Sequence, residues 1–310
     1  MNNFQSDPSF LNRVNRPWVE QKGFSHWGMA LLWLVIIFVV SQVIVAITAV
    51  SILFATGAVS TAEELMAAME SRLDVLFIGN SVGQILCFGL ATFLVAGLHI
   101  TSEKKRTFLR ITWNEKTPVY MLLAVVLILV IQPVIMFFGY LNSLLPVPEF
   151  LEEMQQNQYQ MFEDFLRTDG VLFFGLLHIA LVPAFAEEIL FRGYILRAFE
   201  KSGGIILAIL FSSLVFALFH LQLTNLLPLA TLGAVMGLLT WLSGSIWPAV
   251  VAHFVNNAAA VIMGTFMPDR AFADMTPDVL PPIWMLGVSI VLTVIMINVI
   301  YRNSNNQLQT

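Results

Sequence analysis

Eight apolar runs divide the 310-residue chain, and each is long enough to cross a lipid bilayer as a helix. They cover 27–55, 75–100, 119–141, 171–199, 204–221, 226–242, 246–267 and 280–301. Helices satisfy their own backbone hydrogen bonds, which the apolar bilayer interior demands. With 58% hydrophobic and 11% charged residues, the composition lies far from soluble domains, in which about a quarter of residues are charged. The sequence therefore predicts an all-α, polytopic membrane helix bundle of about eight transmembrane helices.

The distribution of positive charge predicts the orientation of this bundle. If the N-terminus lies inside, the cytoplasmic parts hold eleven of the fifteen lysines and arginines, namely Arg13, Arg16, Lys22, Lys104, Lys105, Arg106, Arg110, Lys116, Arg197, Lys201 and Arg302. The opposite side holds Arg72, Arg167 and Arg270. Cytoplasmic loops of membrane proteins carry an excess of such cations. We therefore expect both termini in the cytoplasm, as an even number of spans requires.

The remaining segments predict the domain organisation. Residues 1–26 form a polar leader that we expect in the cytoplasm. A secretory signal would have its apolar core much nearer the N-terminus. Residues 27–301 form one transmembrane domain, and 302–310 a cytoplasmic tail. Apolar positions at helical spacing in 145–170 predict an amphipathic helix at the outer interface, acting as a cap or a substrate gate. The single cysteine, Cys87, excludes an intrachain disulfide.

A cluster of three ionisable side chains interrupts the middle of the fourth apolar run. Glu187, Glu188 and Arg192 lie within it, and charge at membrane depth is costly and is usually functional. On a helix Glu188 and Arg192 share a face, whereas Glu187 is rotated by about 100°. We therefore expect Glu188 and Arg192 to pair and Glu187 to be free for chemistry. Pro183 lacks an N–H for the carbonyl of Ile179, which predicts a kink and a local opening just before the glutamates.

Two later runs add polar groups at a spacing of four residues. Phe216 and His220 share a helix face in the fifth run, so the ring can wall one side of the imidazole. His253 and Asn257 share a face in the seventh, where they could stabilise an oxyanion or ligate a metal. Polar side chains that bond neighbouring helices would give the same pattern. The positions of these residues along their helices allow Glu187, His220, His253 and Asn257 to meet in one cavity at mid-membrane depth.

These motifs, in this order on successive helices, resemble those of a known family. Glu187-Glu188-x-x-x-Arg192, Phe216-x-x-x-His220 and His253-x-x-x-Asn257 look like the three motifs of the CAAX prenyl protease and bacteriocin-processing family, also called CPBP or Abi. The resemblance covers the second half of the chain, with a motif-bearing core at about 171–267. It implies an intramembrane protease, and three motifs in order inside predicted spans make a strong signal.

The resemblance also implies a role for each matched residue. Glu187 corresponds to the glutamate that activates water, and His220 to the histidine that helps to hold or deprotonate it. His253 and Asn257 correspond to the pair that stabilises the tetrahedral oxyanion. Burial makes a carboxylate a stronger base, which agrees with the role implied for Glu187.

The family implies two further assignments. Glu188 and Arg192 correspond to a supporting pair. Members are often described as metalloproteases, and Glu187, His220 and His253 could hold zinc with one open position. The chain has no His-Glu-x-x-His helix, so we favour a glutamate mechanism without a cofactor over the zinc version.

The leading functional hypothesis is an endopeptidase that hydrolyses a peptide bond of a membrane-associated protein or peptide in the lipid bilayer. A transporter that uses the buried polar cluster as a relay, and a non-catalytic membrane scaffold, are the alternatives. The features are compatible with a bacterial inner membrane. No nucleic-acid partner is expected, and the sequence does not indicate an oligomeric state.

Overall fold

The computed structural model describes residues 15–273 and 279–304, and every element in these parts is a helix. The elements are α2 (Trp18–Gln21), α3 (His26–Ala55), α4 (Ala62–Ser71), α5 (Leu73–Gly83), η2 (Gln84–Ala91), α6 (Thr92–Val95), η3 (Ala96–His99), α7 (Lys105–Phe108), α8 (Thr117–Val130), α9 (Gln132–Ser143), α10 (Glu149–Leu166), α11 (Val171–Gly175), η4 (Leu176–Leu181), α12 (Val182–Glu188), η5 (Ile189–Ile195), α13 (Leu196–Gly203), α14 (Ile205–Phe219), η6 (Leu223–Asn225), α15 (Leu226–Ser243), α16 (Trp247–Phe266), α17 (Pro268–Ala273) and α18 (Ile283–Ser304). The all-α architecture predicted from the sequence is confirmed.

The structure does not confirm the predicted number of spans. Within the described residues, six helices are long and apolar enough to cross a membrane, and α8 with α9 makes a seventh if this pair is one span. The pair is bent by 47°, where Pro133 cannot donate a backbone hydrogen bond. The predicted fifth span is α14, whose 15 residues extend about 22 Å, less than the roughly 30 Å hydrocarbon core. The count of eight is therefore not confirmed, although each predicted run is helical.

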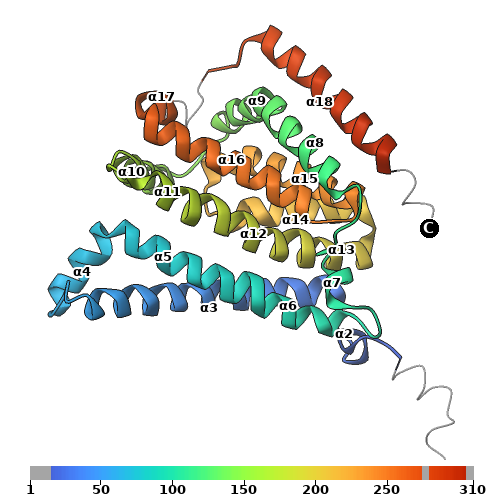
Figure 1. Cartoon of the computed structure of the whole chain (residues 1–310), viewed down its shortest axis with the longest axis horizontal. Helices are drawn as coiled ribbons and strands as arrows, with labels where there is room; N and C mark the ends of the chain where they lie inside the picture. The colour runs from blue at the N-terminus through green and yellow to red at the C-terminus, as the bar shows by residue number, and fades with distance from the viewer. Residues whose placement is uncertain (1–14, 274–278, 305–310) are drawn as a thin grey trace, which may run out of the picture.

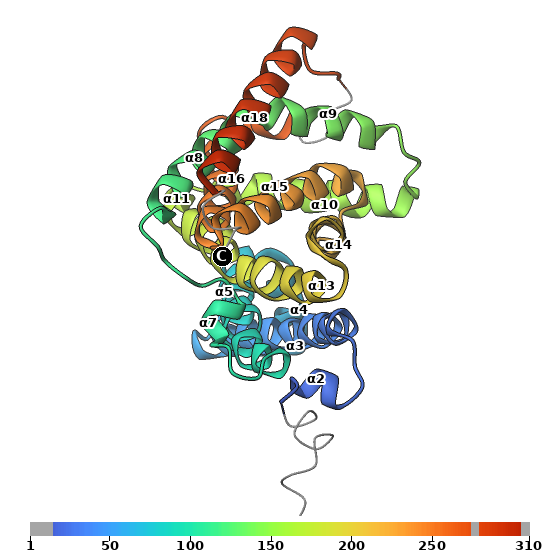
Figure 2. The ribbon, with the colours of Figure 1, turned by 90° about the vertical axis from the view of Figure 1, so that its right-hand side faces the viewer.

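The helices stack in layers, with the helix that carries the two glutamates near the middle (Figures 1 and 2). The antiparallel pair of α3 with α5 and η2 forms one outer layer. The continuous helix of α11, η4, α12, η5 and α13 lies next to it, followed by α14, α15 and α16. Helices α8, α9 and α18 form the far side. All residues from 186 to 196 are buried, so the central helix has protein on all sides there.

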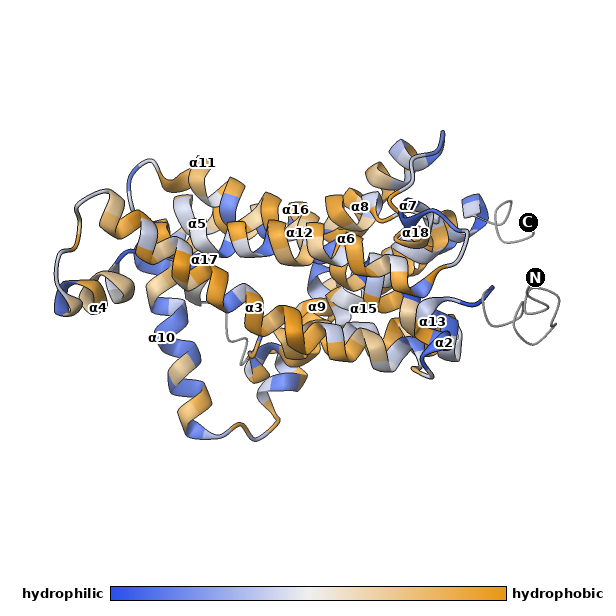
Figure 3. Ribbon diagram, turned by 90° about the horizontal axis from the view of Figure 1, so that it is seen from below, coloured by the Kyte–Doolittle hydropathy of each residue, from blue (hydrophilic) through white to orange (hydrophobic). Residues whose placement is uncertain are grey.

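The outermost helices expose apolar side chains. Val35 and Ile47 of α3 and Val291 of α18 are each more than half exposed. Figure 3 shows mainly hydrophobic residues along the long helices, and hydrophilic residues in α10 and toward the two ends of the bundle. An outer surface of this kind is suited to lipid chains, as expected for a bundle that crosses a bilayer.

The described chain begins and ends at the same end of the bundle (Figures 1 and 3). Contacts at this end join loops that the charge pattern assigned to the cytoplasm. Lys116 Nζ donates to the Asn303 carbonyl at 2.9 Å, and Arg110 pairs with Glu200 at 3.0 Å. At the opposite end Arg167 pairs with Asp269 at 2.7 Å. The segregation of cations is thus real in space, whereas the side of the membrane on which each end lies stays a prediction.

Two terminal segments were also predicted. Of the leader, residues 15–26 are described and include α2, while 1–14 lie outside the described residues. Of the tail, 302–304 end α18, and 305–310 lie outside. The tight turn after α15 ends the helix at Gly244, which has φ 66, a left-handed conformation that glycine adopts easily.

A chain of four polar side chains ties the start of α3 to the central helix. His26 Nδ1 lies 2.9 Å from His99 Nδ1, and His26 Nε2 lies 3.0 Å from Glu20 Oε1. His99 Nε2 lies 2.8 Å from the Tyr194 hydroxyl. His99 and Tyr194 are fully buried. Because buried polar groups need partners, this chain fixes how α2 and α3 dock onto η3 and η5.

Candidate active site

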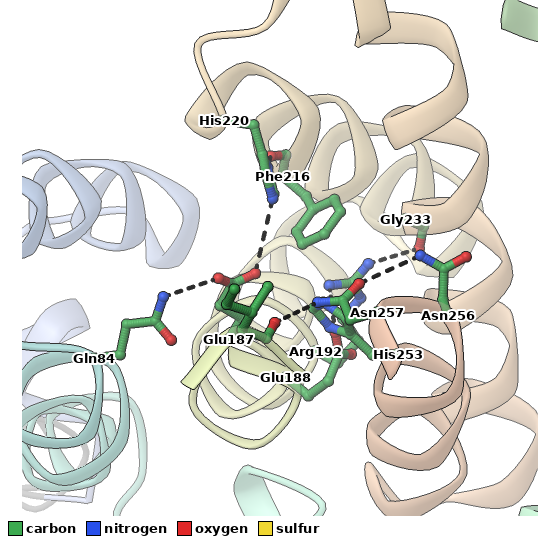
Figure 4. A network of polar contacts seen from close by, with 11 residues as sticks. Gln84, Glu187, Glu188, Arg192, Phe216, His220, Gly233, His253, Asn256 and Asn257 are labelled. Atoms are coloured by element: carbon green, nitrogen blue, oxygen red, sulfur yellow. Dashed lines mark hydrogen bonds and ion pairs between the residues drawn. The ribbon is translucent and has the colours of Figure 1, made fainter. Parts of the chain in front are cut away.

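The central helix opens locally before the glutamates, as Pro183 predicts. The opening takes the form of wide π-helical turns in η4, and a second π-helical segment, η5, follows Glu188. Such turns in membrane helices often occur at functional sites. Glu187 and Glu188 thus lie in a short α-helical stretch between two widened segments, and their side chains diverge into different surroundings (Figure 4).

Glu188 pairs with Arg192, as predicted, and also holds His253. Glu188 Oε1 accepts Arg192 Nη1 at 2.9 Å and His253 Nδ1 at 2.9 Å. Both members of the ion pair are essentially fully buried. The carboxylate only accepts, so His253 carries its hydrogen on Nδ1 and its Nε2 is free of this contact. The sequence did not predict the Glu188–His253 bond, which joins the central helix to α16.

Arg192 has two further partners that satisfy its buried guanidinium. Nη2 donates to the carbonyl of Gly233 at 3.2 Å, and the guanidinium lies over the ring of Phe216, 4.3 Å from its centroid. A Cβ on Gly233 would lie 3.0 Å from the Cα of Ser213, so only glycine lets α14 and α15 pack this closely. The arginine is therefore a fixed structural cation that joins η5 to α14 and α15.

Glu187 of α12 faces His220, which directly follows the last residue of α14. Glu187 Oε2 lies 4.0 Å from His220 Nε2, and Glu187 Oε1 accepts Gln84 Nε2 at 3.2 Å. His220 Nδ1 donates to the carbonyl of Phe216 at 2.8 Å, since a carbonyl can only accept. A neutral His220 therefore presents the lone pair of Nε2 toward Glu187. The separation of 4.0 Å is too long for a direct hydrogen bond and suits a bridging water.

Phe216 packs against the His220 imidazole, as the spacing of four residues predicted. Its ring lies 4.7 Å from the His220 ring and 6.0 Å from the His253 ring, each edge to face. Together with the Arg192 contact, one side chain therefore limits the rotation of both histidines and of the arginine.

Asn257 satisfies the carbonyl that Pro183 leaves without its helical donor. Asn257 Nδ2 donates to the Ile179 carbonyl at 3.2 Å. Its Oδ1 accepts Asn256 Nδ2 at 3.3 Å, and Asn256 Oδ1 accepts Gln132 Nε2 at 3.3 Å. The amides thus form a chain across α9, α16 and η4. One N–H of Asn257 is engaged in structure, and the other is left for a ligand.

These side chains converge on one cavity of about 350 Å³. Its lining includes all four residues predicted to be catalytic, Glu187, His220, His253 and Asn257, so the predicted convergence is confirmed. Their chemical roles stay predictions. The rest of the lining is mainly apolar, as is usual for small-molecule and peptide sites.

Helix α10 covers part of this cavity, which is the position that a cap or a gate requires. Tyr159, Phe162 and Leu166 of α10 line it. The Tyr159 hydroxyl accepts the side-chain amides of Gln155 and Asn225. Burial raises the pKa of Tyr159 above its ordinary value, so the hydroxyl keeps its proton. The predicted amphipathic helix therefore exists and borders the site.

The three side chains of the zinc alternative, Glu187, His220 and His253, do not form a ligand set here. His253 directs Nδ1 to Glu188, and Glu187 and His220 are 4.0 Å apart at their nearest. Across the described residues, no group of three or more His, Cys, Asp or Glu side chains could hold a metal ion.

Three polar residues at this site were missed at the sequence level. Gln84, Gln132 and Asn256 are amides inside apolar runs. Their positions at membrane depth were the available signal, because uncharged amides there also need partners. Sequence reasoning gave weight to charged groups and so passed over them.

Comparison with known families agrees with this geometry. Residues 169–259 match the model of a family described as type II CAAX prenyl endopeptidase Rce1-like. No curated protein and no solved structure gives a significant match. The matched segment starts just before α11, ends within α16 and contains all three motifs. The match covers 91 of the 310 residues, and over this segment it supports the resemblance to the CAAX prenyl protease and bacteriocin-processing family (CPBP, Abi) of intramembrane proteases.

Proposed function

We propose that this chain is an intramembrane endopeptidase in which Glu187 and His220 activate a water molecule. The observation that carries the proposal is the separation of 4.0 Å between Glu187 Oε2 and His220 Nε2 at the wall of the cavity. Both atoms are acceptors when the ring is neutral, so one water can donate a hydrogen to each. Its oxygen lone pairs then face a substrate carbonyl in the cavity.

The reaction follows from this arrangement. Glu187 removes a proton from the water as the oxygen attacks the carbonyl carbon of the scissile peptide. The C=O π bond breaks and gives a tetrahedral oxyanion. Glu187 then returns the proton to the amide nitrogen as the C–N bond breaks, so one water is consumed and a carboxylic acid and an amine are formed, which become a carboxylate and an ammonium group by proton transfer.

In this proposal His253 and Asn257 stabilise the oxyanion. Asn257 has one N–H beyond the bond to Ile179. His253 donates from Nε2 only as an imidazolium, because Nδ1–H points to Glu188. The Glu188 carboxylate stabilises that cation. The roles implied by the family are therefore compatible with the geometry, with Glu188 acting through His253 as well as pairing with Arg192.

The substrate we propose is a membrane-associated protein or peptide, and the family description suggests a C-terminal CAAX sequence as the first probe. Purified protein in liposomes should cleave an internally quenched CAAX peptide, tested with and without a prenyl group. Cleavage of neither form would contradict this substrate class. Peptides trapped by Glu187→Ala in a bacterial inner membrane would then identify the natural substrate.

Glu187→Gln tests the catalytic assignment. This variant should insert and unfold like the wild type but cleave at least 1,000-fold more slowly, roughly the loss expected when a general base is removed. Glu63→Gln on the exposed surface of α4 is the matched control. Full cleavage by Glu187→Gln would refute the mechanism. A transporter would instead move solute across liposomes without peptide products, and a scaffold would keep its phenotype in Glu187→Gln cells.

The zinc version of the mechanism is tested separately. Purified protein is titrated with a chelator and its metal content is measured by elemental analysis. Cleavage that persists without bound metal supports the glutamate mechanism, whereas loss with the chelator and recovery with zinc supports the alternative.

A further inference from the structure

Gln84 reaches the site from the half of the chain that carries none of the three motifs. It is the first residue of η2, is only 6% exposed, and donates from Nε2 to Glu187 Oε1 at 3.2 Å. The matched family segment begins at residue 169 and does not contain it. Figure 4 shows the amide and His220 approaching the two carboxylate oxygens of Glu187 from different directions.

The contact makes the two oxygens of Glu187 different. A carboxylate can only accept, so the amide must present its NH₂ group to Oε1. Oε2 is then directed toward His220 Nε2. Without the amide, rotation about the last side-chain bond of Glu187 would be freer, because torsions of this kind are broad. The amide therefore selects the oxygen that meets the proposed water.

The backbone around Gln84 is built for a close approach to two neighbouring helices. A Cβ on Gly79 would lie 2.8 Å from the Val45 carbonyl, and one on Gly83 would lie 3.2 Å from the Ser41 carbonyl, so α5 packs tightly against α3. The π-helical turns of η2 begin at Gln84 itself. One turn earlier, Ser81 Oγ lies 2.8 Å from His178 Nδ1 on the central helix.

Ser81 and Gln84 thus make two separate polar links between the same pair of helices. The Ser81–His178 link docks the helices, and it does not involve Glu187. If docking were the only purpose of Gln84, the two links would be interchangeable. The Ser81–His178 contact therefore serves as an internal control for a positioning role of Gln84.

We infer that Gln84 is a positioning residue, which orients the Glu187 carboxylate so that Oε2 is the base toward water. The inference rests on the proposed function of Glu187. It assigns to the first half of the chain a direct part in the reaction, beyond its role in packing.

The test compares three variants in liposomes with the internally quenched CAAX peptide. Gln84→Met keeps the size and removes the donor, and we expect kcat to fall about ten- to a hundredfold with KM unchanged, the loss of a hydrogen bond to a charged group. Gln84→Glu replaces the donor by a carboxyl group and should lose more. Ser81→Ala should keep the kcat of the wild type. Wild-type kcat in Gln84→Met, or an equal loss in Ser81→Ala, would overturn the inference.

A spectroscopic measurement separates this inference from the proposed function. The infrared carboxylate band of Glu187 is assigned by its difference from Glu187→Gln. We expect that band to shift in Gln84→Met and to stay in place in Ser81→Ala, and an unmoved band in Gln84→Met would refute the contact. If Glu187→Gln still cleaves peptide while the band shifts, the proposed function fails and the positioning contact stands.

Discussion

Glu188→Gln removes the negative charge beside Arg192 while keeping the shape of the side chain. Arg192 is 1% exposed, and its charge would then be left with a neutral amide, the Gly233 carbonyl and the Phe216 ring. At 2.9 Å and an effective dielectric constant of about 20, the lost attraction is roughly 6 kcal/mol. Part of this is offset by the desolvation of the carboxylate, so we expect a loss of about 3–5 kcal/mol in the free energy of unfolding.

Glu187→Gln should behave differently. Among the described residues, the one ion-pair contact of Glu187 is with His220 at 4.0 Å, and its amide form keeps the size of the side chain. We expect its unfolding free energy to lie within about 1 kcal/mol of the wild type. The two adjacent glutamates would then separate into one that mainly stabilises the fold and one that mainly serves the reaction.

The assay is thermal and denaturant unfolding in detergent, with peptide cleavage measured on the same samples. A double variant, Glu188→Leu with Arg192→Met, tests the physical reason. Removing both charges should return most of the stability lost in Glu188→Gln, because replacing a buried ion pair by apolar groups is often neutral. Cleavage should stay low, since His253 still lacks its carboxylate partner. Equal unfolding free energies for the two single glutamine variants, or no recovery in the double variant, would refute the reasoning.

Other predictions concern the residues around the site and the orientation of the bundle. Asn257→Ala leaves the Ile179 carbonyl without its side-chain donor and should cost about 1–3 kcal/mol in unfolding free energy, together with cleavage activity. Gly233→Ala places a Cβ 3.0 Å from Ser213 and should cost about 1–3 kcal/mol, measured by thermal unfolding. Phe216→Leu should lower kcat, because both histidines lose their wall. In a Cys87→Ser background, an impermeant maleimide should label Ser202→Cys only from the cytoplasmic side and Thr168→Cys only from the opposite side.

The helical runs and the motif residues were predictable because they depend on local periodicity. Apolar length marks a spanning helix, and a spacing of four residues places Glu188 beside Arg192 and Phe216 beside His220 in any α-helix. The outcome for α14 shows the limit of this approach. Its apolar run is continuous, but Gly204, with φ 78, precedes the helix and His220 follows Phe219, so only 15 residues are helical.

The partners across helices could not be derived from the sequence. Glu188 meets His253 and Glu187 meets Gln84 only through the packing of helices far apart in the chain. The oxyanion pair was inferred from the shared face of His253 and Asn257, yet each has a structural bond on another helix. Local spacing indicates which groups can share a face, and tertiary packing decides which of them meet.

Hydrogen bonds link Glu20, His26, His99 and Tyr194 in series, and this series has only one arrangement of protons when both imidazole rings are neutral. The Glu20 carboxylate accepts, so His26 donates from Nε2 and must accept at Nδ1. His99 therefore donates from Nδ1 and accepts at Nε2, which leaves the Tyr194 hydroxyl as donor. A carboxylate on the short helix α2 thus dictates the tautomer of a fully buried imidazole. Through that ring it also orients a hydroxyl two residues from Arg192, so the start of the chain and the central helix share a single hydrogen-bond direction.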